Sequence, residues 1–366
     1  MKVPKEIQKL KIALTTDCVL ACRHCRVDKK AGLTISLDDA ARGVDMLISS
    51  PGKLKRLELY GGEPFLKFRL FKDIVQYAVR LSARSCKKLS ISAASNGLVL
   101  NEDHLKFIRE NRVNLSISIS GSEKAHDLTR VYPGGGGSYA DLKKKLALIF
   151  SRLEAENIVA LECVHPACAA SLGPDLRRLA DFGFKVINIE CVHGPDWGQS
   201  SLKAFESALL SFSGRLFTAV KKGVYIAPEP FLEFFRVKGA AASLQCPLYR
   251  DLELYPDGVF SFYPFAFMDY SKWRKAVKLG TSISGLCRRY SACIPGGKLC
   301  AGCVSKYYVI GGLAGGARAY TLRTAVLKKV LLDIMRRART EKAFNGYVRW
   351  LAGIEQRTYV DYRGMK

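Results

Sequence analysis

A repeated alternation of short apolar segments and longer amphipathic segments constrains the fold of this chain more than any other feature. Up to about residue 225, each short β-branched run is followed by a loop and then by a helical pattern. The expected strands are Leu10–Thr15, Lys55–Tyr60, Lys88–Ala93, Val113–Ser120, Ile158–Val164 and Lys185–Val192. The expected helices are Leu37–Ser49, Phe68–Ala83, Glu102–Glu110, Tyr139–Glu154, Pro174–Phe182 and Ser201–Lys221. Such alternation produces parallel strands with right-handed crossovers, so the sequence predicts an α/β fold, a partial (β/α)6 TIM-like parallel barrel.

The alternation stops after residues 227–230, where the composition changes. The following segment is rich in Gly, Cys and Tyr and contains two short strand candidates, Leu252–Tyr255 and Val259–Phe262. From Thr321 to Leu351 a basic helical pattern returns, with an apolar stripe that predicts packing on the body of the protein. We therefore expect a barrel over residues 1–230, a small cysteine-rich domain over 231–315 and a basic helical tail over 316–366.

Composition indicates a cytoplasmic protein whose clustered cysteines bind metal or do redox chemistry. No apolar run reaches the roughly 18 residues of a membrane helix, and the first residues lack the apolar core of an export signal. The chain nevertheless contains 12 cysteines. In a reducing cytoplasm, clustered cysteines bind metal or do redox chemistry more often than they form disulfides.

The formal net charge is +25, from 58 Lys and Arg against 33 Asp and Glu. Such a charge attracts anionic partners, among them RNA, acidic peptides and anionic small molecules. Because the basic residues are spread along the chain, a generally charge-rich surface is the favoured explanation.

Three cysteines follow directly after the first expected strand, in the spacing Cys18-x3-Cys22-x2-Cys25. Three thiolates on one short loop can bind three irons of a 4Fe–4S cluster and leave the fourth iron open for another ligand. The alternative is a structural zinc ion, but zinc needs a fourth ligand, which His24 would supply only with awkward geometry. The spacing and its place after a strand favour the cluster.

Further motifs follow the next expected strands, at the end of the barrel where such folds place their chemistry. Gly61-Gly62-Glu63-Pro64 follows the second strand; its glycines let the backbone approach a ligand, and its carboxylate suits an ammonium group. Ser95-Asn96-Gly97 follows the third strand.

The fourth strand carries the longest motif, which begins with Ser116-Ile-Ser118-Ile-Ser120-Gly121. It continues with His126-Asp127-x2-Arg130 and Gly137-Ser138-Tyr139. A simple structural explanation for Arg130 is an ion pair with Asp127 at a helix end.

In this order, the motifs resemble those of the radical S-adenosylmethionine (SAM) superfamily, over about residues 8–225 and more weakly to about residue 315. In that family the amino and carboxylate groups of SAM chelate the open iron of the cluster. One-electron reduction then cleaves the sulfonium, and a 5′-deoxyadenosyl radical abstracts hydrogen from the substrate. The resemblance implies that Cys18, Cys22 and Cys25 bind this cluster.

The same resemblance implies the contacts with SAM. Within Gly61, Gly62, Glu63 and Pro64, the Glu63 side chain and the Gly62 carbonyl would hold the methionine amino group. Ser95 and Asn96 would contact the adenosyl moiety, Ser118 the ribose and Arg130 the carboxylate. The motif around Ser118 looks like that of the peptide- and protein-modifying branch, except that Ser120 replaces the usual Asp.

One repeated pattern is independent of the resemblance. The fifth and sixth strands end alike, in Glu162-Cys163-Val164-His165 and Glu190-Cys191-Val192-His193. Alternation along a strand places Glu with Val on one face and Cys with His on the other, so a regular barrel would line its pocket with one such pair from each strand. His165 and His193 are then candidates for proton transfer, with Glu162 and Glu190 as alternatives. Structurally satisfied strand-end residues are an equally good explanation.

A second cysteine group comprises Cys246, Cys287, Cys293, Cys300 and Cys303. Its surroundings resemble the SPASM or twitch extension of radical enzymes that mature peptides, an extension that binds two auxiliary 4Fe–4S clusters. Tyr263, Val309 and Leu313 stand where that pattern has cysteines, so we expect one auxiliary cluster here. Its ligands would be Cys246, Cys300, Cys303 and either Cys287 or Cys293. A zinc ion on Cys300 and Cys303, or no metal, are the alternatives.

Three substrate classes follow from these features. The first is a peptide or protein side chain, on the resemblance around Ser118 and the auxiliary cysteines. The second is a tetrapyrrole or similar small molecule, because those relatives share the Cys-x3-Cys-x-His-Cys form. The third is RNA, which only the net charge suggests. A ferredoxin- or flavodoxin-type electron donor would reduce the cluster, and no membrane partner is expected.

Overall fold

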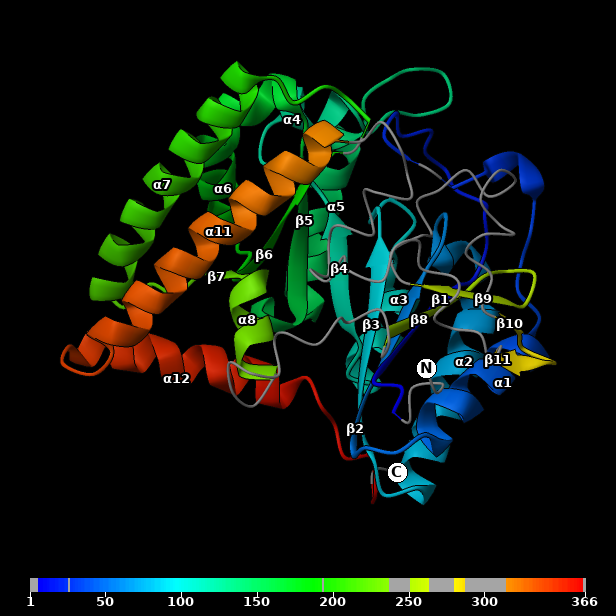
Figure 1. The fold of residues 1–366 in the computed structure, drawn as a ribbon. Helices are drawn as coiled ribbons and strands as arrows, with labels where there is room; N and C mark the ends of the chain where they lie inside the picture. Colours follow the sequence, from blue (N-terminus) through cyan, green and yellow to red (C-terminus); the bar gives the residue numbers. More distant parts are fainter. Residues whose placement is uncertain are drawn as a thin grey trace.

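The computed structural model describes residues 6–25, 27–192, 194–236, 251–262, 280–286 and 314–364. One sheet organises this part of the chain, with the strand order β11-β10-β9-β8-β1-β2-β3-β4-β5-β6-β7 (Figure 1). Neighbouring strands from β8 through β1 to β7 are parallel, and β8 to β11 pair antiparallel. The strands are β1 (Lys9–Ala13), β2 (Leu54–Tyr60), β3 (Lys88–Ser95), β4 (Asn114–Ser118), β5 (Ile158–Val164), β6 (Val186–Cys191), β7 (Ala227–Pro228), β8 (Asp251–Leu254), β9 (Val259–Phe262), β10 (Gly280–Thr281) and β11 (Gly285–Leu286).

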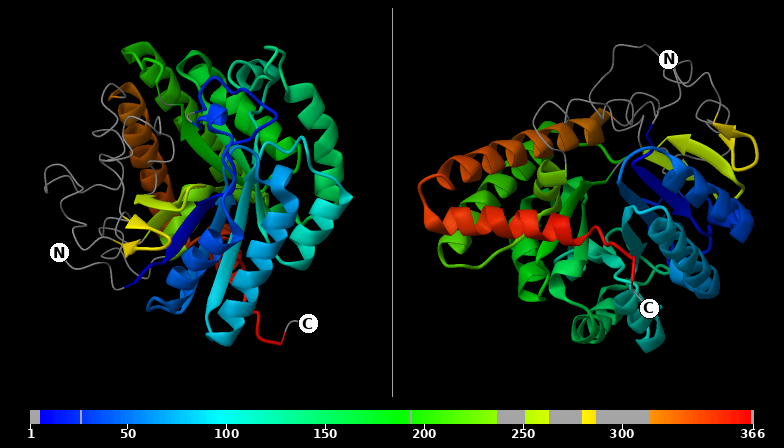
Figure 2. Two further views of the ribbon diagram at one scale, coloured as in Figure 1. Left: turned by 90° about the vertical axis from the view of Figure 1, so that its right-hand side faces the viewer. Right: turned by 90° about the horizontal axis from the view of Figure 1, so that it is seen from below.

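Helices connect the parallel strands and surround the sheet (Figure 2). They are α1 (Leu37–Ser49), α2 (Phe68–Arg84), α3 (Glu102–Glu110), α4 (Glu123–Asp127), α5 (Tyr139–Arg152), α6 (Leu172–Asp181), α7 (Gln199–Lys221), α8 (Glu229–Arg236), α11 (Ala314–Arg337) and α12 (Lys342–Arg357). Short 3-10 turns are η1 (Lys29–Ala31), η2 (Pro64–Lys67), η3 (Ala155–Asn157) and η4 (Pro166–Ser171).

The predicted α/β barrel is confirmed. The six predicted strands and six predicted helices are all present; β5, α1 and α3 have the predicted bounds, and the others differ by at most two residues at either end. Local signals account for this agreement. For example, the Ser36 hydroxyl accepts a hydrogen bond from the Asp39 N–H at 3.0 Å and so starts α1 where the sequence predicts it.

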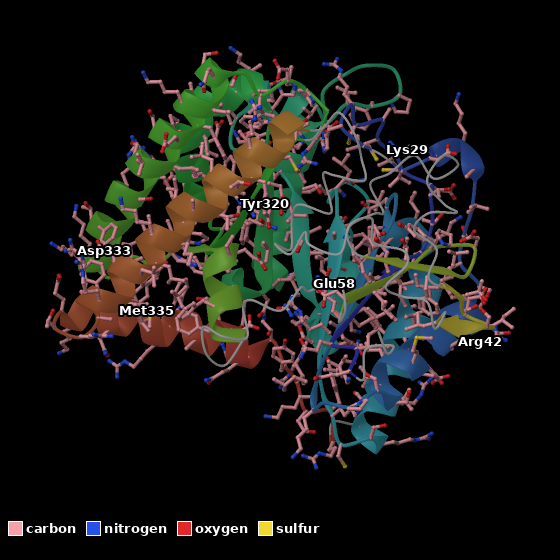
Figure 3. All side chains as sticks on the ribbon, viewed as in Figure 1. Lys29, Arg42, Glu58, Tyr320, Asp333 and Met335 are labelled. Carbon is pink, nitrogen blue, oxygen red and sulfur yellow. The ribbon has the colours of Figure 1, made fainter. Side chains whose placement is uncertain are left out.

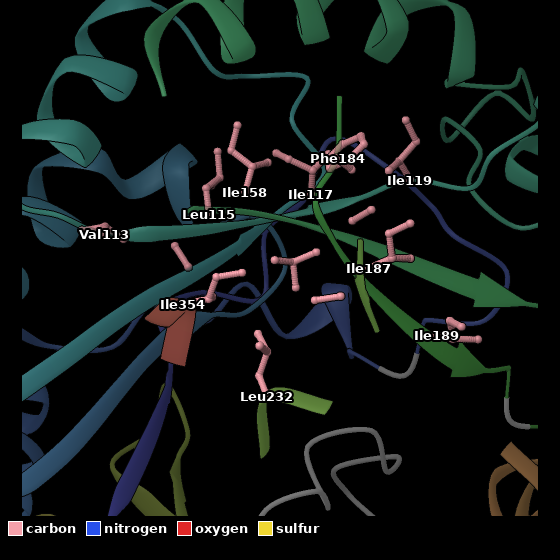
Figure 4. Close-up of a cluster of buried hydrophobic side chains, with 14 of the residues drawn as sticks. Val113, Leu115, Ile117, Ile119, Ile158, Phe184, Ile187, Ile189, Leu232 and Ile354 are labelled. Atoms are coloured by element: carbon pink, nitrogen blue, oxygen red, sulfur yellow. The ribbon is translucent and has the colours of Figure 1, made fainter. Parts of the chain in front are cut away.

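The two faces of the sheet differ in polarity. Leu57, Ile91 and Leu115 are completely buried on the face that the helices cover, and Figure 4 shows Leu115 beside Ile117 and Ile158 in this cluster. On the opposite face, the strand register aligns Lys11 with Glu58, Ser92 and Asn114. The apolar face supplies the folding core, which leaves a polar interior for chemistry.

The predicted pair of strands beyond residue 250 is also confirmed, as β8 and β9. They pair antiparallel around Gly258, whose φ of +78° requires the left-handed conformation that glycine tolerates. β8 pairs with β1, so in the described residues this hairpin continues the barrel sheet.

The basic tail packs on the barrel through α11 and α12. Val326, Val330 and Ile334 of the predicted apolar stripe are buried, and α11 lies against α7 and β6 (Figure 1). After α12 the chain reaches β3, where Leu89 and Val360 exchange two backbone hydrogen bonds of 3.0 Å. In the part of the chain that the structure describes, no helix combines the length and apolarity that membrane crossing requires.

Candidate active site

The loop that follows β1 carries Cys18, Cys22 and Cys25, all partly buried. Its backbone is held by the segment after α4: the Ala21 N–H donates to the Val131 carbonyl and the Arg23 N–H to the Thr129 carbonyl, each at 2.7 Å. Figure 3 shows Lys29 beyond this loop; its ammonium donates to the Leu20 carbonyl. The three thiols therefore sit on a fixed stretch of backbone rather than on a free loop.

Among the described residues, no three His, Cys, Asp or Glu side chains gather closely enough to bind one metal ion. Each cysteine of a cubane cluster binds a different iron, so its ligands need not converge on one point. Partial burial removes water from the Cys18 and Cys22 thiols and so raises their pKa.

Gly61 and Gly62 bring the end of β2 against the base of the cysteine loop. The Gly62 N–H donates to the Thr15 carbonyl and the Glu63 N–H to the Asp17 carbonyl, each at 2.7 Å. A Cβ atom on Gly62 would lie 2.1 Å from the Asp17 carbonyl oxygen, which no side chain permits. Close backbone approach is thus the physical reason for glycine here, and it orients the chain that leads into Cys18.

Glu63 is completely buried and ties the end of β2 to the end of β3. Its Oε1 accepts hydrogen bonds from the Ser95 hydroxyl at 2.9 Å and the Phe65 N–H at 3.3 Å, and its Oε2 accepts one from the Asn96 N–H at 2.8 Å. Burial raises the pKa of this carboxyl to about 7, and the three donors partly oppose the shift. The Glu63 side chain therefore connects the loop after β2 with the loop after β3.

The loop after β4 positions Arg130 through a buried network. Asp127 Oδ1 accepts the N–H groups of Ser138 and Tyr139 at 2.9 and 3.0 Å. Arg130 instead donates to the Leu161 carbonyl at 3.0 Å, so the simple Asp127–Arg130 pairing considered from the sequence is wrong. Arg130 is 4% exposed, and its Nε has no partner among the described residues.

His126 and Ser118 complete this side of the site. His126 accepts a hydrogen bond from the Ser120 N–H at 3.2 Å and lies 3.0 Å from the Ser138 hydroxyl. Burial and the neighbouring Arg130 lower the pKa of His126 to about 2, so its ring is neutral and serves to hold the loop. Ser118 lies on the polar face of β4, half-buried and aligned with Leu161 of β5.

The two Glu-Cys-Val-His segments do not face the barrel in the same way. The register pairs Cys163 with Glu190 and Glu162 with Ile189. The expectation of one Cys and His pair from each strand in the pocket is therefore wrong: β5 turns Cys163 inward, whereas β6 turns Glu190 inward. His193 lies outside the described residues.

Glu162 lies in the layer between the sheet and the helices. It is 2% exposed and accepts a hydrogen bond from the Gly121 N–H at 2.9 Å. Burial, followed by the negative charge of Asp175, raises its pKa to about 7. His165 accepts a hydrogen bond from the Ala167 N–H at 3.2 Å at the start of η4, and burial lowers its pKa.

A comparison with known protein families matches the segment of the chain that contains most of these groups. Residues 12–162, which hold the cysteine loop, both glycines, Arg130 and Glu162, match the family described as the Radical SAM superfamily. This match places a radical SAM domain within residues 12–162 of the chain.

Three curated relatives each match 40% or less of this chain. An uncharacterised protein of Methanocaldococcus jannaschii is 28% identical over 145 residues, 40% of this chain and 49% of that protein. A probable GTP 3′,8-cyclase of the same organism is 26% identical over 132 residues, 35% of this chain and 42% of the cyclase. A cysteine-type anaerobic sulfatase-maturating enzyme of Clostridium novyi is 27% identical over 90 residues, 24% of each chain. The chain spans about half or less of the length of these relatives.

A solved structure extends the likeness beyond the radical SAM segment. Native anSMEcpe with bound AdoMet and Cp18Cys peptide has a TM-score of 0.67 at 15% identity, over 90% of this chain and 99% of that one. At this identity the likeness shows a shared fold.

Sequence reasoning missed one buried charge beside the radical SAM segment, Arg323 of α11. β7 pairs with Val186 and Ile187, and in the described part of the chain no strand covers the edge of β6 beyond that point. Arg323 donates to the Ile189 carbonyl there and lies 3.5 Å from Glu190 Oε1. Its guanidinium also stacks 4.2 Å from the ring of Tyr320, which Figure 3 labels on α11. No local signal distinguishes this arginine from the other basic residues of the tail.

The predicted auxiliary ligands Cys246, Cys287, Cys293, Cys300 and Cys303 all lie outside the described residues. The auxiliary cluster therefore stays a prediction from the sequence.

Proposed function

We propose that this chain is an enzyme that cleaves SAM reductively and removes a hydrogen atom from a peptide or protein side chain. The observation that carries the proposal is the position of Arg130: its guanidinium is near enough to Cys22 to oppose the burial-raised pKa of that thiol, and the backbone on either side of Arg130 binds the cysteine loop. Arg130 is buried and keeps one N–H without a partner among the described residues. Such a group is costly unless a ligand satisfies it, and a carboxylate is the natural acceptor.

The residues present fit the cofactors that the superfamily implies. Cys18, Cys22 and Cys25 would hold a 4Fe–4S cluster, and Arg130 would hold the SAM carboxylate. Both oxygens of Glu63 already accept hydrogen bonds, which favours the Gly62 carbonyl for direct contact with the amino group. Ser118 faces the same interior and would take the ribose. When bound, the cluster supplies an electron and SAM supplies the carbon radical that takes a hydrogen atom from the substrate.

A peptide substrate is supported by the shared fold with anSMEcpe, whose structure contains a peptide and which matches nearly the whole length of this chain. The likeness to a GTP 3′,8-cyclase covers 35% of this chain. A match of that extent supports a shared cofactor-binding segment and gives little support for a shared nucleotide substrate. The net charge of +25 suits an acidic precursor peptide. The reducing cytoplasm predicted from the sequence is the compartment that would preserve such a cluster.

Proton transfer during the reaction would fall to an inward-facing group. Of the four candidates, Glu190 faces the interior and its side chain is 34% exposed, whereas Glu162 lies in the helix layer. His165 and His193 remain candidates beyond the ends of β5 and β6. We favour Glu190, paired with Arg323, as the group that a substrate would meet.

Anaerobic reconstitution tests the proposal. We expect about eight irons per chain if the auxiliary cluster forms and about four if it does not. Under a strong reductant the wild type should release 5′-deoxyadenosine from SAM, and a Cys18→Ala, Cys22→Ala, Cys25→Ala protein should release none. Cys86→Ala, which removes an exposed cysteine elsewhere, is the matched control. A zinc ion on the three cysteines, or a loaded protein that does not cleave SAM, would refute it.

A further inference from the structure

We propose that Asn96 is a positioning residue whose side-chain amide donates a hydrogen bond to the Cys18 sulfur and raises the reduction potential of the cluster bound there. The inference rests on the cluster assigned under the proposed function. It gives Asn96 a role toward the metal in place of the adenosyl contact that the family resemblance implies.

The hydrogen-bonding pattern fixes which end of the Asn96 amide faces the thiol. Asn96 Oδ1 accepts the Leu98 N–H at 3.0 Å, so Nδ2 is the atom that lies 3.8 Å from Cys18 Sγ. A flipped amide would set Nδ2 against the Leu98 N–H, donor against donor. The Leu20 N–H approaches the same sulfur at 3.4 Å. Two N–H donors, one from the cysteine loop and one from the segment after β3, therefore approach Cys18 Sγ.

The donor is held in place before any ligand binds. Asn96 is 9% exposed, and its own N–H donates to the buried Glu63 carboxylate at 2.8 Å. Ser95 links the same carboxylate to the Gly97 N–H, and Gly97 has a φ of +80°. The Glu63 carboxylate therefore fixes the turn at the end of β3 through the Ser95 hydroxyl and the Asn96 N–H. The Asn96 side-chain amide can rotate away from Cys18 only if its hydrogen bond with the Leu98 N–H breaks.

A hydrogen bond to a ligand thiolate changes the relative stability of the two oxidation states. Reduction adds negative charge to the cluster and its sulfur ligands, and an N–H donor stabilises that charge. A donor at Cys18 therefore makes the cluster easier to reduce. Glu63, which orients Asn96, would act on the potential through this amide.

Redox titration of the reconstituted protein, followed by EPR spectroscopy without SAM, tests the inference. The signal that disappears in Cys18→Ala identifies the relevant cluster. Asn96→Asp keeps the size of the side chain and the acceptor for Leu98, but replaces the donor by an anionic oxygen. We expect its midpoint potential to shift to more negative values, and Asn96→Ala to shift in the same direction by a smaller amount.

Asn101→Ala is the matched control, because Asn101 caps α3 through the His104 N–H and loses a structural hydrogen bond of the same kind. Its midpoint should equal that of the wild type. If the Asn96 variants retain full iron but titrate like the wild type, or shift to more positive values, the inference is wrong and the proposed function stands. If the wild type binds no iron at Cys18, the proposed function itself fails.

Discussion

β5 and β6 end in the same four residue types, Glu-Cys-Val-His, yet they turn opposite faces toward the barrel interior. In β5 the glutamate is buried against the helix layer and holds the Gly121 N–H. In β6 the glutamate faces inward and pairs with Arg323 from the tail. The difference is a register offset of one residue, which exchanges the faces of every side chain in the second segment.

The comparison teaches that one short motif can serve two purposes. The buried Glu162 carboxyl, with a raised pKa, supports the loop that carries Arg130. The Glu190 carboxyl is about one-third exposed beside a guanidinium, and we propose that it is the one that meets the substrate. The two glutamates should therefore respond in opposite ways to substitution: Glu162 through stability and Glu190 through turnover.

The largest expected effect is on stability. Glu162→Ala removes a buried side chain and leaves the Gly121 N–H unsatisfied, so at pH 6 it should lower the free energy of unfolding by about 3 kcal/mol. Glu190→Ala affects a side chain that is one-third exposed and should cost about 1 kcal/mol. Urea unfolding of the metal-free protein measures both. Equal losses in the two variants would mean that the strand ends are equivalent after all.

The pH dependence of stability gives a second test of the buried position of Glu162. Glu162 has a pKa of about 7 when folded against 4.5 as its ordinary value. The folded state keeps a proton that the unfolded chain has released, so this contribution is complete below pH 4.5 and is lost as the pH rises through 7.

Relative to Glu162→Gln, the wild type should lose about 2 to 3 kcal/mol of unfolding free energy between pH 5 and 8. Glu206→Gln, which changes an exposed glutamate on α7, should leave the wild-type profile unchanged. Parallel stability profiles for wild type and Glu162→Gln would contradict the buried position of Glu162.

The smallest expected effect is the energetic coupling between Glu190 of β6 and Arg323 of α11. A double-mutant cycle of Glu190→Gln and Arg323→Met should give a coupling energy of about 1 kcal/mol, because one partner is buried and the other is partly solvated. The same cycle with Arg318→Met, which removes an exposed arginine of α11, should give none. Absence of coupling in the first cycle would remove Arg323 from the site.

The sequence allowed prediction of the elements because hydrophobic period and turn residues are local signals. It also allowed prediction of the convergence of Cys18, Gly62, Asn96 and Arg130, since each follows a parallel strand at the same end of the barrel. Three features could not be predicted from the sequence. The register of β6 depends on how the strands pair, and the hydrogen bonds of the buried Glu63 depend on how two loops pack. Arg323 reaches the end of β6 from α11, where its hydrogen-bond partner lies 134 residues earlier in the chain.

The tail has a consequence for how this protein is made. Val360 bridges Leu89, and the Tyr362 hydroxyl donates to the Asn111 carbonyl across 251 positions of sequence. A nascent chain cannot form these contacts while Tyr362 is still inside the ribosome, and the search for such distant partners is entropically slow. β3 and the end of α3 therefore lack these contacts until the chain has been made as far as Tyr362, so this side of the barrel is completed late in folding.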